Sequence, residues 1–544
     1  MTRTEGLDVL IVGAGPTGLV LALWLTQQGI RVRVVDKSTG PGSTSRAMAV
    51  QARTLELYRQ LDLSDAVVAA GHQNPAINLW IKGHKKAQLG FGSAGENLTP
   101  YPFLLVYPQD HHERLLAEHL AAMGVQVEHQ TELLSFEDTG TNVVARLRTA
   151  DGQEHTCETR YLAGCDGAKS LVRHQLGTGF DGGTYAQIFY VADVEVTGPA
   201  ADGAAHISLD DADFVALLAY ENQAGQATKA RLIGAVRDGL DESEDTDTLS
   251  DTLSFDDVSH RAIDALGLQV QKVHWFSTYR VHHRVTRHYR VGRAFLLGDA
   301  AHVHSPAGGQ GMNTGIGDAI NLAWKLAAVL RNQAPDNLLD SYEIERKAFA
   351  LKLVETTDRL FTFVTNENPF ANFVRTQIAP VLAPLAYGVD AVREYMFRVL
   401  SQTLINYRQS PLSTGTQDED EVHGGDRLPW VATNDGPEKG AEHGTDNYES
   451  LRSITWQVHI YGDPTEPVTE ELRQACAACG IPLRRFDYTP AHQAAGLARD
   501  ALYLLRPDTY VALVEASGDV QALAGYFAQR GINPSSGAHP QQSL

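Results

Sequence analysis

The hydrophobic and polar positions at the start of the chain predict a strand, a turn, a helix and a second strand. Residues 7–12 form an apolar run, several glycines follow, and a mostly apolar segment then extends to about residue 28. Gly29 is suited to end that helix, and the next apolar run, IRVRVVD, ends at Asp36. This order is typical of a βαβ unit with a right-handed crossover, so we expect a parallel sheet here.

A different pattern begins at about residue 181 and continues to about residue 290. Strand-like runs such as YAQIFYVADVEV and KARLIGAVR alternate there with polar turns, which indicates an antiparallel sheet. The buried-strand pattern returns in RAFLLGDA, and a helical pattern follows it. Residues 413–425 are polar and acidic and contain glycine, so they mark a boundary. Beyond it, the strand SITWQVHIYG and the helix around TEELRQACAACG predict a small, separate α/β domain.

Length and composition limit the class of protein. A chain of 544 residues is too long for one hydrophobic core, since single cores stop growing near ~250–300 residues. The formal net charge of -21 disfavours nucleic acid and anionic membranes as partners, because both select clustered Lys and Arg. No apolar run approaches the ~20 residues of a membrane-spanning helix, and no secretory signal is expected before the first strand. With only four cysteines, the chain is expected to be cytoplasmic.

The first glycine turn carries a dinucleotide-binding fingerprint. Gly13, Gly15 and Gly18 have the spacing G-x-G-x-x-G between strand and helix, and Asp36 lies 18 residues beyond the last of them. Gly13 permits a tight turn, Gly15 lets the backbone approach a pyrophosphate, and Gly18 allows close packing of helix on strand. The helix N-terminus then faces the phosphates, and Asp36 can accept hydrogen bonds from ribose hydroxyls. This fingerprint alone does not distinguish NAD from FAD.

The segment LLGDAAHVHSPAGGQGMN, residues 296–313, allows two interpretations. Asp299, His302 and His304 place a carboxylate and two imidazoles within six residues, which a metal site could use. The same segment holds three glycines directly before a predicted helix. A glycine-rich loop at a helix N-terminus is a preformed anion site, suited to the negative charge of a reduced flavin.

Three segments together resemble the signatures of FAD-dependent aromatic hydroxylases, the group A flavoprotein monooxygenases. They are the N-terminal fingerprint, LAGCDGAKSLVR at residues 162–173, and the segment at residues 296–313. The resemblance covers essentially the whole chain, and GGDRLPW is similar to the start of the thioredoxin-like domain of the larger members. It implies an α/β protein with a Rossmann-type FAD-binding domain, an antiparallel-sheet substrate domain and a thioredoxin-like C-terminal domain. The expected boundaries are 1–180 and 291–412 for the FAD-binding domain with its helical segment, 181–290 for the substrate domain, 413–425 for a linker, and 426–544 for the C-terminal domain.

The resemblance also implies which residues contact the cofactor. Asp299 is expected to bond the ribityl or pyrophosphate portion of FAD, Pro306 to shape the flavin edge where oxygen adds, and the amides of residues 308–313 to face the pyrimidine end of the isoalloxazine. The full expected set is Gly13, Gly15, Gly18, Asp36, Arg46, Gln109, Asp166, Asp299, Pro306, Gly309, Gly311, Met312 and Asn313. No metal is expected, and the two histidines become packing or hydrogen-bonding residues.

Structural alternatives stay open for three of the polar residues that the resemblance singles out. Arg173 follows Asp166 in the second signature and could instead belong to a buried turn with a structural ion pair. Arg53 and Gln109 each stand near the start of a predicted helix, where a surface position is an alternative to a cofactor contact.

On the substrate side, Tyr279 falls where phenol hydroxylase has a substrate-contacting tyrosine. A phenol here could orient or help deprotonate a substrate hydroxyl, and a core aromatic on a sheet is an equal alternative. Met48 stands where phenol hydroxylase carries an acidic residue near its substrate, which disfavours simple phenol as the substrate. His282 and His283 could lie near the site, but a sheet or surface position is favoured for both.

Cys476 and Cys479 form a C-x-x-C pair inside the suspected thioredoxin-like domain. A redox-active pair stands at a helix N-terminus, which lowers the thiol pKa. This pair is predicted at the C-terminal end of a helix, where the dipole raises the thiol pKa. We therefore expect both cysteines to be structural.

The resemblance implies an FAD-dependent monooxygenase that uses NAD(P)H and O2 to hydroxylate a phenolic aromatic substrate through a flavin C4a-hydroperoxide. FAD is expected to be bound non-covalently, and a homodimer is common in this family. The first alternative is a Baeyer–Villiger or epoxidising oxygenase acting on a polycyclic or polyketide-type substrate, because fold does not fix chemistry. A flavin-binding module without turnover is an alternative of another class. The substrate, the regiochemistry and the choice of NADH or NADPH stay open.

Overall fold

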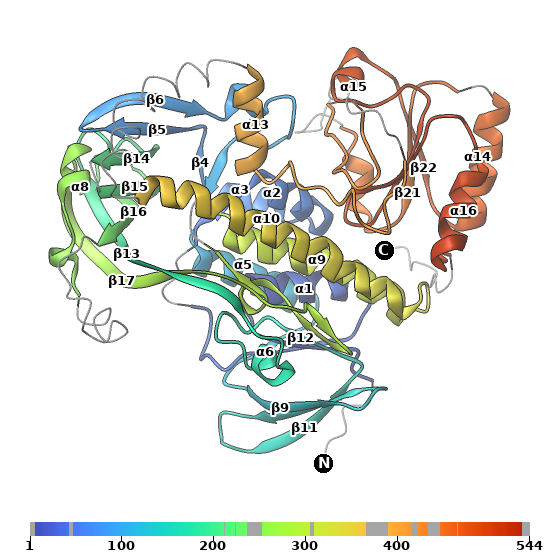
Figure 1. Ribbon diagram of the computed structural model, residues 1–544, viewed down its shortest axis with the longest axis horizontal. Coiled ribbons are helices and arrows are strands. Elements are labelled where there is room, and N and C mark those ends of the chain that lie inside the picture. The colour runs from blue at the N-terminus through green and yellow to red at the C-terminus, as the bar shows by residue number, and fades with distance from the viewer. Residues whose placement is uncertain are drawn as a thin grey trace.

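The computed structural model describes ten segments of the chain (Figure 1). They are residues 6–42, 47–210, 213–223, 225–236, 253–304, 309–365, 390–415, 421–432, 446–464 and 466–535. Two of the expected cofactor residues, Arg46 and Pro306, lie outside the described residues. None of the helices in these segments is both long and apolar enough to cross a membrane.

A six-stranded sheet forms the first part of the fold, called the parallel-sheet unit below. Its strand order is β18-β19-β12-β1-β2-β8, and all neighbouring strands are parallel except β18 and β19. The strands are β1 (Val9–Val12), β2 (Val32–Val35), β8 (Val127–Glu128), β12 (Tyr161–Gly164), β18 (Arg290–Val291) and β19 (Ala294–Leu296). Every residue of β1 is buried, as expected for a central parallel strand covered on both faces.

Helices cover this sheet. The predicted βαβ unit is present as β1, α1 (Pro16–Gln27) and β2, and α1 packs against α5 (Gln109–Ala122) and α9 (Gly311–Leu330). Both α1 and α9 are mostly apolar and buried on nearly all sides, so they belong to the core rather than the surface. Further helices of this region are α2 (Ala52–Tyr58), α3 (Ser64–Ala70), α6 (Leu171–Leu176), α10 (Asp340–Thr365) and α13 (Asp390–Leu400).

An eight-stranded sheet forms the second part, called the antiparallel-sheet unit. Its order is β20-β17-β13-β16-β15-β14-β5-β6, and only β14 and β5 are parallel neighbours. The strands are β5 (Ala76–Ile81), β6 (His84–Gly90), β13 (Asp181–Thr197), β14 (Ala205–Asp210), β15 (Asp213–Glu221), β16 (Thr228–Val236), β17 (Gln269–Val285) and β20 (His302–Val303). The antiparallel pattern expected for residues 181–290 is present, and residues 76–90 add two strands that this pattern does not indicate.

The two faces of the antiparallel sheet have different neighbours. On one face, Tyr190 and Leu232 pack with Ile263 of α8 (Arg261–Ala265) in a buried apolar cluster. On the other face, Phe189 and Val281 form a smaller cluster with Tyr279 against them. This second face borders a cavity toward the parallel-sheet unit, described below.

The third part is the C-terminal unit, residues 421–432, 446–464 and 466–535. Its sheet has the order β22-β21-β23-β24, with β21 and β22 parallel and the other neighbours antiparallel. The elements are β21 (Gln457–Tyr461), α14 (Glu466–Cys479), β22 (Leu483–Phe486), α15 (Pro490–Ala494), β23 (Leu502–Leu505), β24 (Val511–Glu515) and α16 (Gln521–Arg530). Figure 1 shows this unit beside the long helix α10. The mixed α/β class is thus confirmed.

Candidate active site

A cavity of about 750 Å³ lies between the start of α1, the inner face of the antiparallel sheet and the segment before α9. Seven of the predicted site residues line it: Gly15, Gln109, Tyr279, Asp299, Gly309, Gly311 and Met312. Segments far apart in sequence therefore meet at one space. Gly13, Gly18, Asp36, Asp166 and Asn313 lie behind this lining, and their side chains or backbones support it, as described below.

The glycine turn is shaped by close backbone contacts. Gly13 has φ +107°, and a Cβ there would stand 2.2 Å from the carbonyl oxygen of Cys165. A Cβ on Gly18 would stand 2.0 Å from the carbonyl oxygen of Gly13, whereas one on Gly15 would meet nothing within 4 Å. Gly13 and Gly18 are thus required for the turn itself, and Gly15 leaves open space beside the N-terminus of α1.

The N-terminus of α1 fits a phosphate group. Its N-cap is Gly15, and no side chain bonds the first backbone N–H groups of the helix. Because these N–H groups and the helix dipole favour an anion, the open space beside Gly15 suits a pyrophosphate. The parts of this turn therefore fit the dinucleotide portion of FAD.

Asp36 braces the same turn. One carboxylate oxygen accepts a hydrogen bond of 2.7 Å from the backbone N–H of Ala14, and the other accepts bonds of 2.7 and 2.5 Å from the N–H and hydroxyl of Ser38. The carboxylate thus ties the strand end to the glycine turn. The ribose contact stays a prediction.

Hydrogen bonds within the second signature, residues 162–173, also stabilise its turn. Asp166 accepts hydrogen bonds from the Ser170 hydroxyl (2.5 Å) and the Val172 N–H (3.1 Å), which anchors the start of α6. Arg173 is buried and donates to the carbonyl oxygens of Ala168 (2.7 Å) and Ala300 (3.0 Å). The second signature is thereby tied to the third, and cofactor contacts by these two side chains remain predictions.

Gln109 opens α5 and lines the cavity. Its amide donates a 2.7 Å hydrogen bond to Glu113, whose other oxygen accepts from the N–H of Gly42 at 3.1 Å. Burial raises the pKa of Glu113 above its ordinary value. The side chain of Gln109 is thus held in place at the cavity wall, and its contact with the ribityl chain stays a prediction.

The third signature is called the flavin loop below, defined as residues 298–304 and 309–314. Asp299 is exposed and lines the cavity, and Gly309 has φ +62° with a would-be Cβ only 2.7 Å from that of Ala49. Asn313 is buried: its amide oxygen accepts from Gln51 N–H (2.9 Å) and the Thr54 hydroxyl (2.8 Å). Its NH2 group donates to the carbonyl oxygens of Ala49 (2.8 Å) and Gly309 (3.1 Å). The side chain of Asn313 therefore fixes the loop, a role that the sequence did not indicate.

Of the two histidines of this loop, His302 belongs to the scaffold, whereas His304 lines the cavity. The Nε2 atom of His302 lies 2.7 Å from a carboxylate oxygen of Asp318, and both side chains are buried. Across the described segments, no group of three or more His, Cys, Asp and Glu side chains could hold a metal ion. His302 thus has the hydrogen-bonding role expected for it.

Sequence reasoning missed Asp318 and its partner Arg346. The guanidinium Nε of Arg346 lies 2.6 Å from Asp318, and both are fully buried. The available signal was a carboxylate inside TGIGDAINLAWKL, a mostly apolar helix, because buried charges are normally paired. Of the two alternatives left open for Arg53, the surface position is wrong: the side chain is 3% exposed and contacts the C-terminal unit.

The substrate side of the cavity is largely apolar. Tyr279 lies on β17 with its ring centroid 6.1 Å from that of Phe189, so it belongs to the sheet's aromatic face and also lines the cavity. Met48 is buried in the same wall. Other lining residues here are Leu218, Ile233, Trp275, Phe276, Val281 and Arg280, the last not anticipated.

The two histidines of β17 are placed by neighbouring strand residues. The Nδ1 atom of His282 lies 2.7 Å from the Thr184 hydroxyl, and the ring centroid of His283 lies 4.8 Å from that of Tyr185. Of the two, only His282 is among the described lining residues of the cavity.

Cys476 and Cys479 lie at the C-terminal end of α14, where the sequence placed them. Burial raises the pKa of Cys476 to about 12, and burial also raises that of Cys479. Both shifts disfavour the reactive thiolate form.

Comparison with known proteins defines the class. Residues 6–357 match the FAD-binding domain family, so the chain belongs to that family. It is 36% identical over 426 residues to 6-methylpretetramide 4-monooxygenase of Streptomyces rimosus, covering 76% of this chain and 72% of that protein. It is 33% identical over 364 residues to pentachlorophenol 4-monooxygenase of Sphingobium chlorophenolicum, covering 65% and 64%.

Solved structures agree. The crystal structure of a ternary complex of aklavinone-11 hydroxylase with FAD and aklavinone superposes with a TM-score of 0.72 and 25% identity, covering 98% of this chain and 100% of that one. The protein is an FAD-dependent monooxygenase of aromatic compounds.

Proposed function

We propose that this monooxygenase hydroxylates a phenolic ring of an aromatic substrate larger than simple phenol. The observation that carries the proposal is the sheet face opposite the flavin loop, where Leu218, Trp275 and Val281 line the cavity and Met48 stands in the same wall. A largely apolar wall with few polar groups is typical of ligand sites. The relatives' names, 6-methylpretetramide 4-monooxygenase and aklavinone-11 hydroxylase, support an aromatic substrate.

Each part of the chain has a proposed role toward FAD. The N-terminus of α1 beside Gly15 binds the pyrophosphate, Gln109 and Asp299 hold the ribityl chain, and the amides of residues 309–313 face the ring system. Bound FAD supplies the redox chemistry, by accepting electrons from NAD(P)H and activating O2. The protein positions the substrate and excludes water from the reacting centre, which the apolar wall supports.

Tyr279 is the proposed substrate contact. Its place among the cavity residues supports a hydrogen bond from its hydroxyl to a substrate oxygen, which would hold the ring and assist removal of the substrate proton. Asp299 is the one carboxylate among the described lining residues. On the substrate side, Met48 stands at the position where phenol hydroxylase carries an acidic residue. A substrate that needs a carboxylate base beside its hydroxyl is therefore disfavoured.

A substrate panel tests the proposal. The purified protein with FAD is mixed with NADH or NADPH, and consumption is followed with single-ring and multi-ring phenols while peroxide is measured. The expected result is substrate-stimulated NAD(P)H oxidation with little peroxide, strongest for multi-ring phenols, and NMR of a hydroxylated product. Ring expansion or epoxidation seen by NMR would contradict hydroxylation, and oxidation that no aromatic compound stimulates would contradict the proposed substrate class.

The remaining assignments are also proposals. The order of β21, α14, β22, β23, β24 and α16, with one parallel pair followed by a hairpin and a helix, supports a thioredoxin-like C-terminal domain. We propose the domain boundaries given from the sequence, except that residues 76–90 are assigned to the substrate domain, because β5 and β6 belong to its sheet. The acidic net charge of -21 and the four cysteines support a cytoplasmic location, and a homodimer is the expected oligomer.

A further inference from the structure

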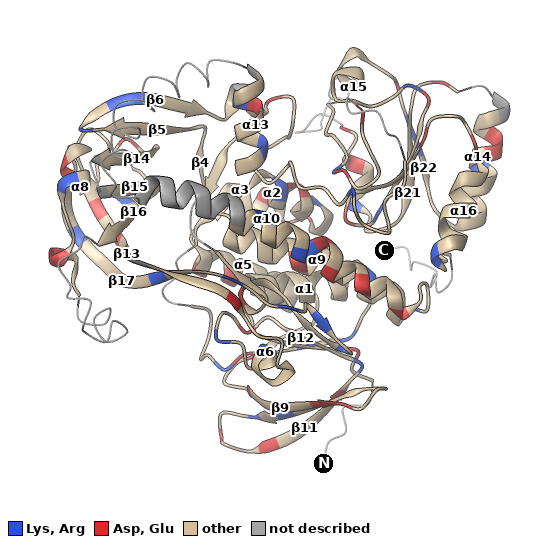
Figure 2. Ribbon diagram, in the orientation of Figure 1, with Lys and Arg blue, Asp and Glu red and all other residues tan. Residues whose placement is uncertain are grey.

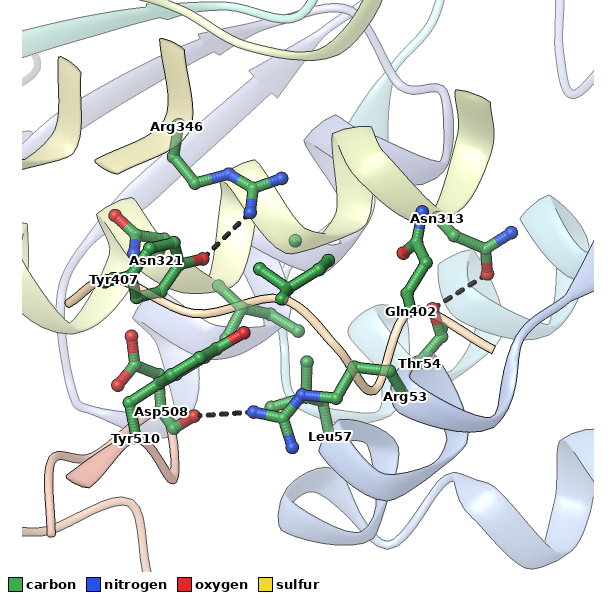
Figure 3. Close-up of a pocket in the computed structure, with 13 residues that line it drawn as sticks. Arg53, Thr54, Leu57, Asn313, Asn321, Arg346, Gln402, Tyr407, Asp508 and Tyr510 are labelled. Carbon is green, nitrogen blue, oxygen red and sulfur yellow. Dashed lines mark hydrogen bonds between the residues drawn. The ribbon is translucent and has the colours of Figure 1, made fainter. Parts of the chain in front are cut away.

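The turn between β23 and β24 carries buried charged groups of the C-terminal unit into contact with the rest of the protein. Arg506, Asp508 and Thr509 are each at most 2% exposed. Thr509 has φ +68°, a conformation that a β-branched residue rarely adopts. Strain of this kind persists only where surrounding contacts impose it, so the turn is tightly constrained. Figure 3 shows Asp508 and Tyr510 of this turn facing Arg53.

A first connection runs from this turn to the flavin loop through α2. The guanidinium of Arg53 donates to the carbonyl oxygen of Asp508 (3.1 Å) and the hydroxyl of Thr509 (2.7 Å). The next residue, Thr54, donates its hydroxyl to the amide oxygen of Asn313 at 2.8 Å. Figure 3 draws the hydrogen bonds from Arg53 to Asp508 and from Thr54 to Asn313. Asn313 in turn bonds the carbonyl oxygen of Gly309, so this connection ends in the flavin loop.

A second connection runs through α10. The ring centroids of Tyr510 and Tyr407 lie 4.3 Å apart, and the hydroxyl of Tyr407 accepts a 2.8 Å hydrogen bond from Arg346. Arg346 also donates to the carbonyl oxygen of Thr314 at 3.0 Å and to Asp318 at 2.6 Å. Figure 2 shows acidic and basic residues adjacent on the described part of α10.

Asp318 links Arg346 to the other end of the flavin loop through hydrogen bonds. Its second carboxylate oxygen accepts from the N–H of Gly298 (3.0 Å) and lies 2.7 Å from His302. Although burial opposes ionisation, Arg346 and His302 hold the pKa of Asp318 below its ordinary value. Arg346 thus reaches both arms of the loop, Thr314 directly and Gly298 through Asp318.

We propose that Arg346 is a positioning residue for the flavin, and that the turn at residues 506–510 holds it from the C-terminal unit. Neither Arg346 nor any residue of this turn lines the cavity, so an effect on the flavin has to pass through the loop. Buried ion pairs add little net stability and can instead select one conformation. The C-terminal unit thereby sets the loop geometry on which the cofactor site depends. This inference rests on the proposed placement of FAD at the flavin loop.

The test compares two mild substitutions of buried tyrosines at the same domain boundary. Tyr407→Phe removes only the hydroxyl that accepts from Arg346. Tyr526→Phe removes a hydroxyl that donates to the carbonyl oxygen of Leu412 at 2.8 Å, away from the loop, and is the matched control. Arg346→Lys is a stronger variant that keeps the charge but not the geometry of three hydrogen bonds.

Three measurements follow the effect: amide hydrogen exchange of residues 298–304 and 309–318 in the apoprotein, the FAD dissociation constant, and the visible spectrum and midpoint potential of bound flavin. We expect Tyr407→Phe and Arg346→Lys to speed amide exchange in these segments. Both should also weaken FAD binding about tenfold, the lower end of the effect seen when residues that orient a ligand's contacts are mutated. Tyr526→Phe should change the thermal midpoint as much as Tyr407→Phe does and leave flavin properties unchanged.

Equal flavin properties and equal loop exchange in Tyr407→Phe, Arg346→Lys and the control would overturn the positioning role. FAD should also slow exchange of the same segments in the wild-type protein. If FAD does not slow exchange of these segments in the wild-type protein, the proposed flavin site is wrong. This result does not depend on the comparison of the apoprotein variants.

Discussion

Arg506 and Glu345 form a two-pronged ion pair across the boundary between the C-terminal unit and α10. The two terminal nitrogens of Arg506 lie 2.7 and 3.0 Å from the two carboxylate oxygens of Glu345, and both side chains are fully buried. Lys325, the Ser410 hydroxyl and the Asn321 amide also donate to Glu345, at 2.8, 2.6 and 2.7 Å. Arg506 also pairs with the buried carboxylate of Asp508 at 2.6 Å. Removing Arg506 therefore breaks two buried ion pairs: it takes this partner from Asp508 and leaves Lys325 as the remaining cation beside Glu345.

The first prediction concerns this pair. Arg506→Met should lower the free energy of unfolding by about 3–5 kcal/mol, the usual cost of leaving a buried charge without its partner. The control is Arg408→Met, which removes an ion pair with Asp426 whose arginine is 48% exposed. That change should cost only about 0–1 kcal/mol. Denaturant unfolding of both variants provides the comparison, and equal losses would contradict the prediction.

The second prediction separates the glycines of the first turn. Gly13→Ala should destabilise the protein, because the new Cβ would stand 2.2 Å from a carbonyl oxygen at φ +107°. Gly15→Ala meets nothing within 4 Å and should leave apoprotein stability unchanged. It should nevertheless weaken FAD binding at least about tenfold, since the methyl group occupies space beside the phosphate-binding N–H groups. Thermal unfolding measures the stability of each variant, and flavin fluorescence titration measures its affinity for FAD. If both variants bind FAD as tightly as the wild type, this placement of FAD is wrong.

The third prediction concerns Tyr279. Replacing it with Phe should lower kcat/KM for the aromatic substrate about 10- to 100-fold and raise the fraction of NAD(P)H that ends as peroxide, because the ring is held less well. Tyr190→Phe, on the opposite face of the same sheet, is the control and should retain coupling. If both variants hydroxylate like the wild type, Tyr279 is only a core aromatic.

How far the sequence predicts this site depends on the range of each contact. The turn and packing roles predicted for Gly13 and Gly18 are present in the structure, because they depend on contacts within one turn. The buried contacts of Arg53 were not predicted, because its partners Asp508 and Thr509 lie 455 and 456 positions away. For the same reason the sequence did not predict that β5 and β6 belong to the antiparallel sheet. β5 joins the sheet through a parallel pair with β14, a strand distant in sequence, so no hairpin turn indicates the pairing. For Asn313 the sequence indicated only a backbone amide toward the flavin, and the hydrogen bonds of its side chain to Gln51 and Ala49 depend on the fold and were not predicted.

The fourth prediction concerns the C-x-x-C pair. Cys479→Ser should retain full turnover and FAD binding, because burial raises the pKa of both thiols and the pair stands at a helix C-terminus. Steady-state hydroxylation assays with and without a thiol reductant measure this. Loss of turnover in a folded Cys479→Ser protein would show that the pair takes part in redox chemistry.

The fifth prediction concerns pH and Lys325. Burial lowers the pKa of Lys325 from 10.5 to about 8 in the folded protein, although Glu345 opposes the shift. Between these two values the unfolded chain binds the proton and the folded chain does not, so stability should rise with pH across this window. The gain should be on the order of 3 kcal/mol, and Lys325→Met should lack it. The measurement is the difference in unfolding free energy between wild type and Lys325→Met, which cancels the tyrosines that titrate in both. That difference should be flat from about pH 6 to 7 and then shift in favour of the wild type above pH 8. A flat difference up to pH 10 would mean that Lys325 stays charged in its buried pair with Glu345.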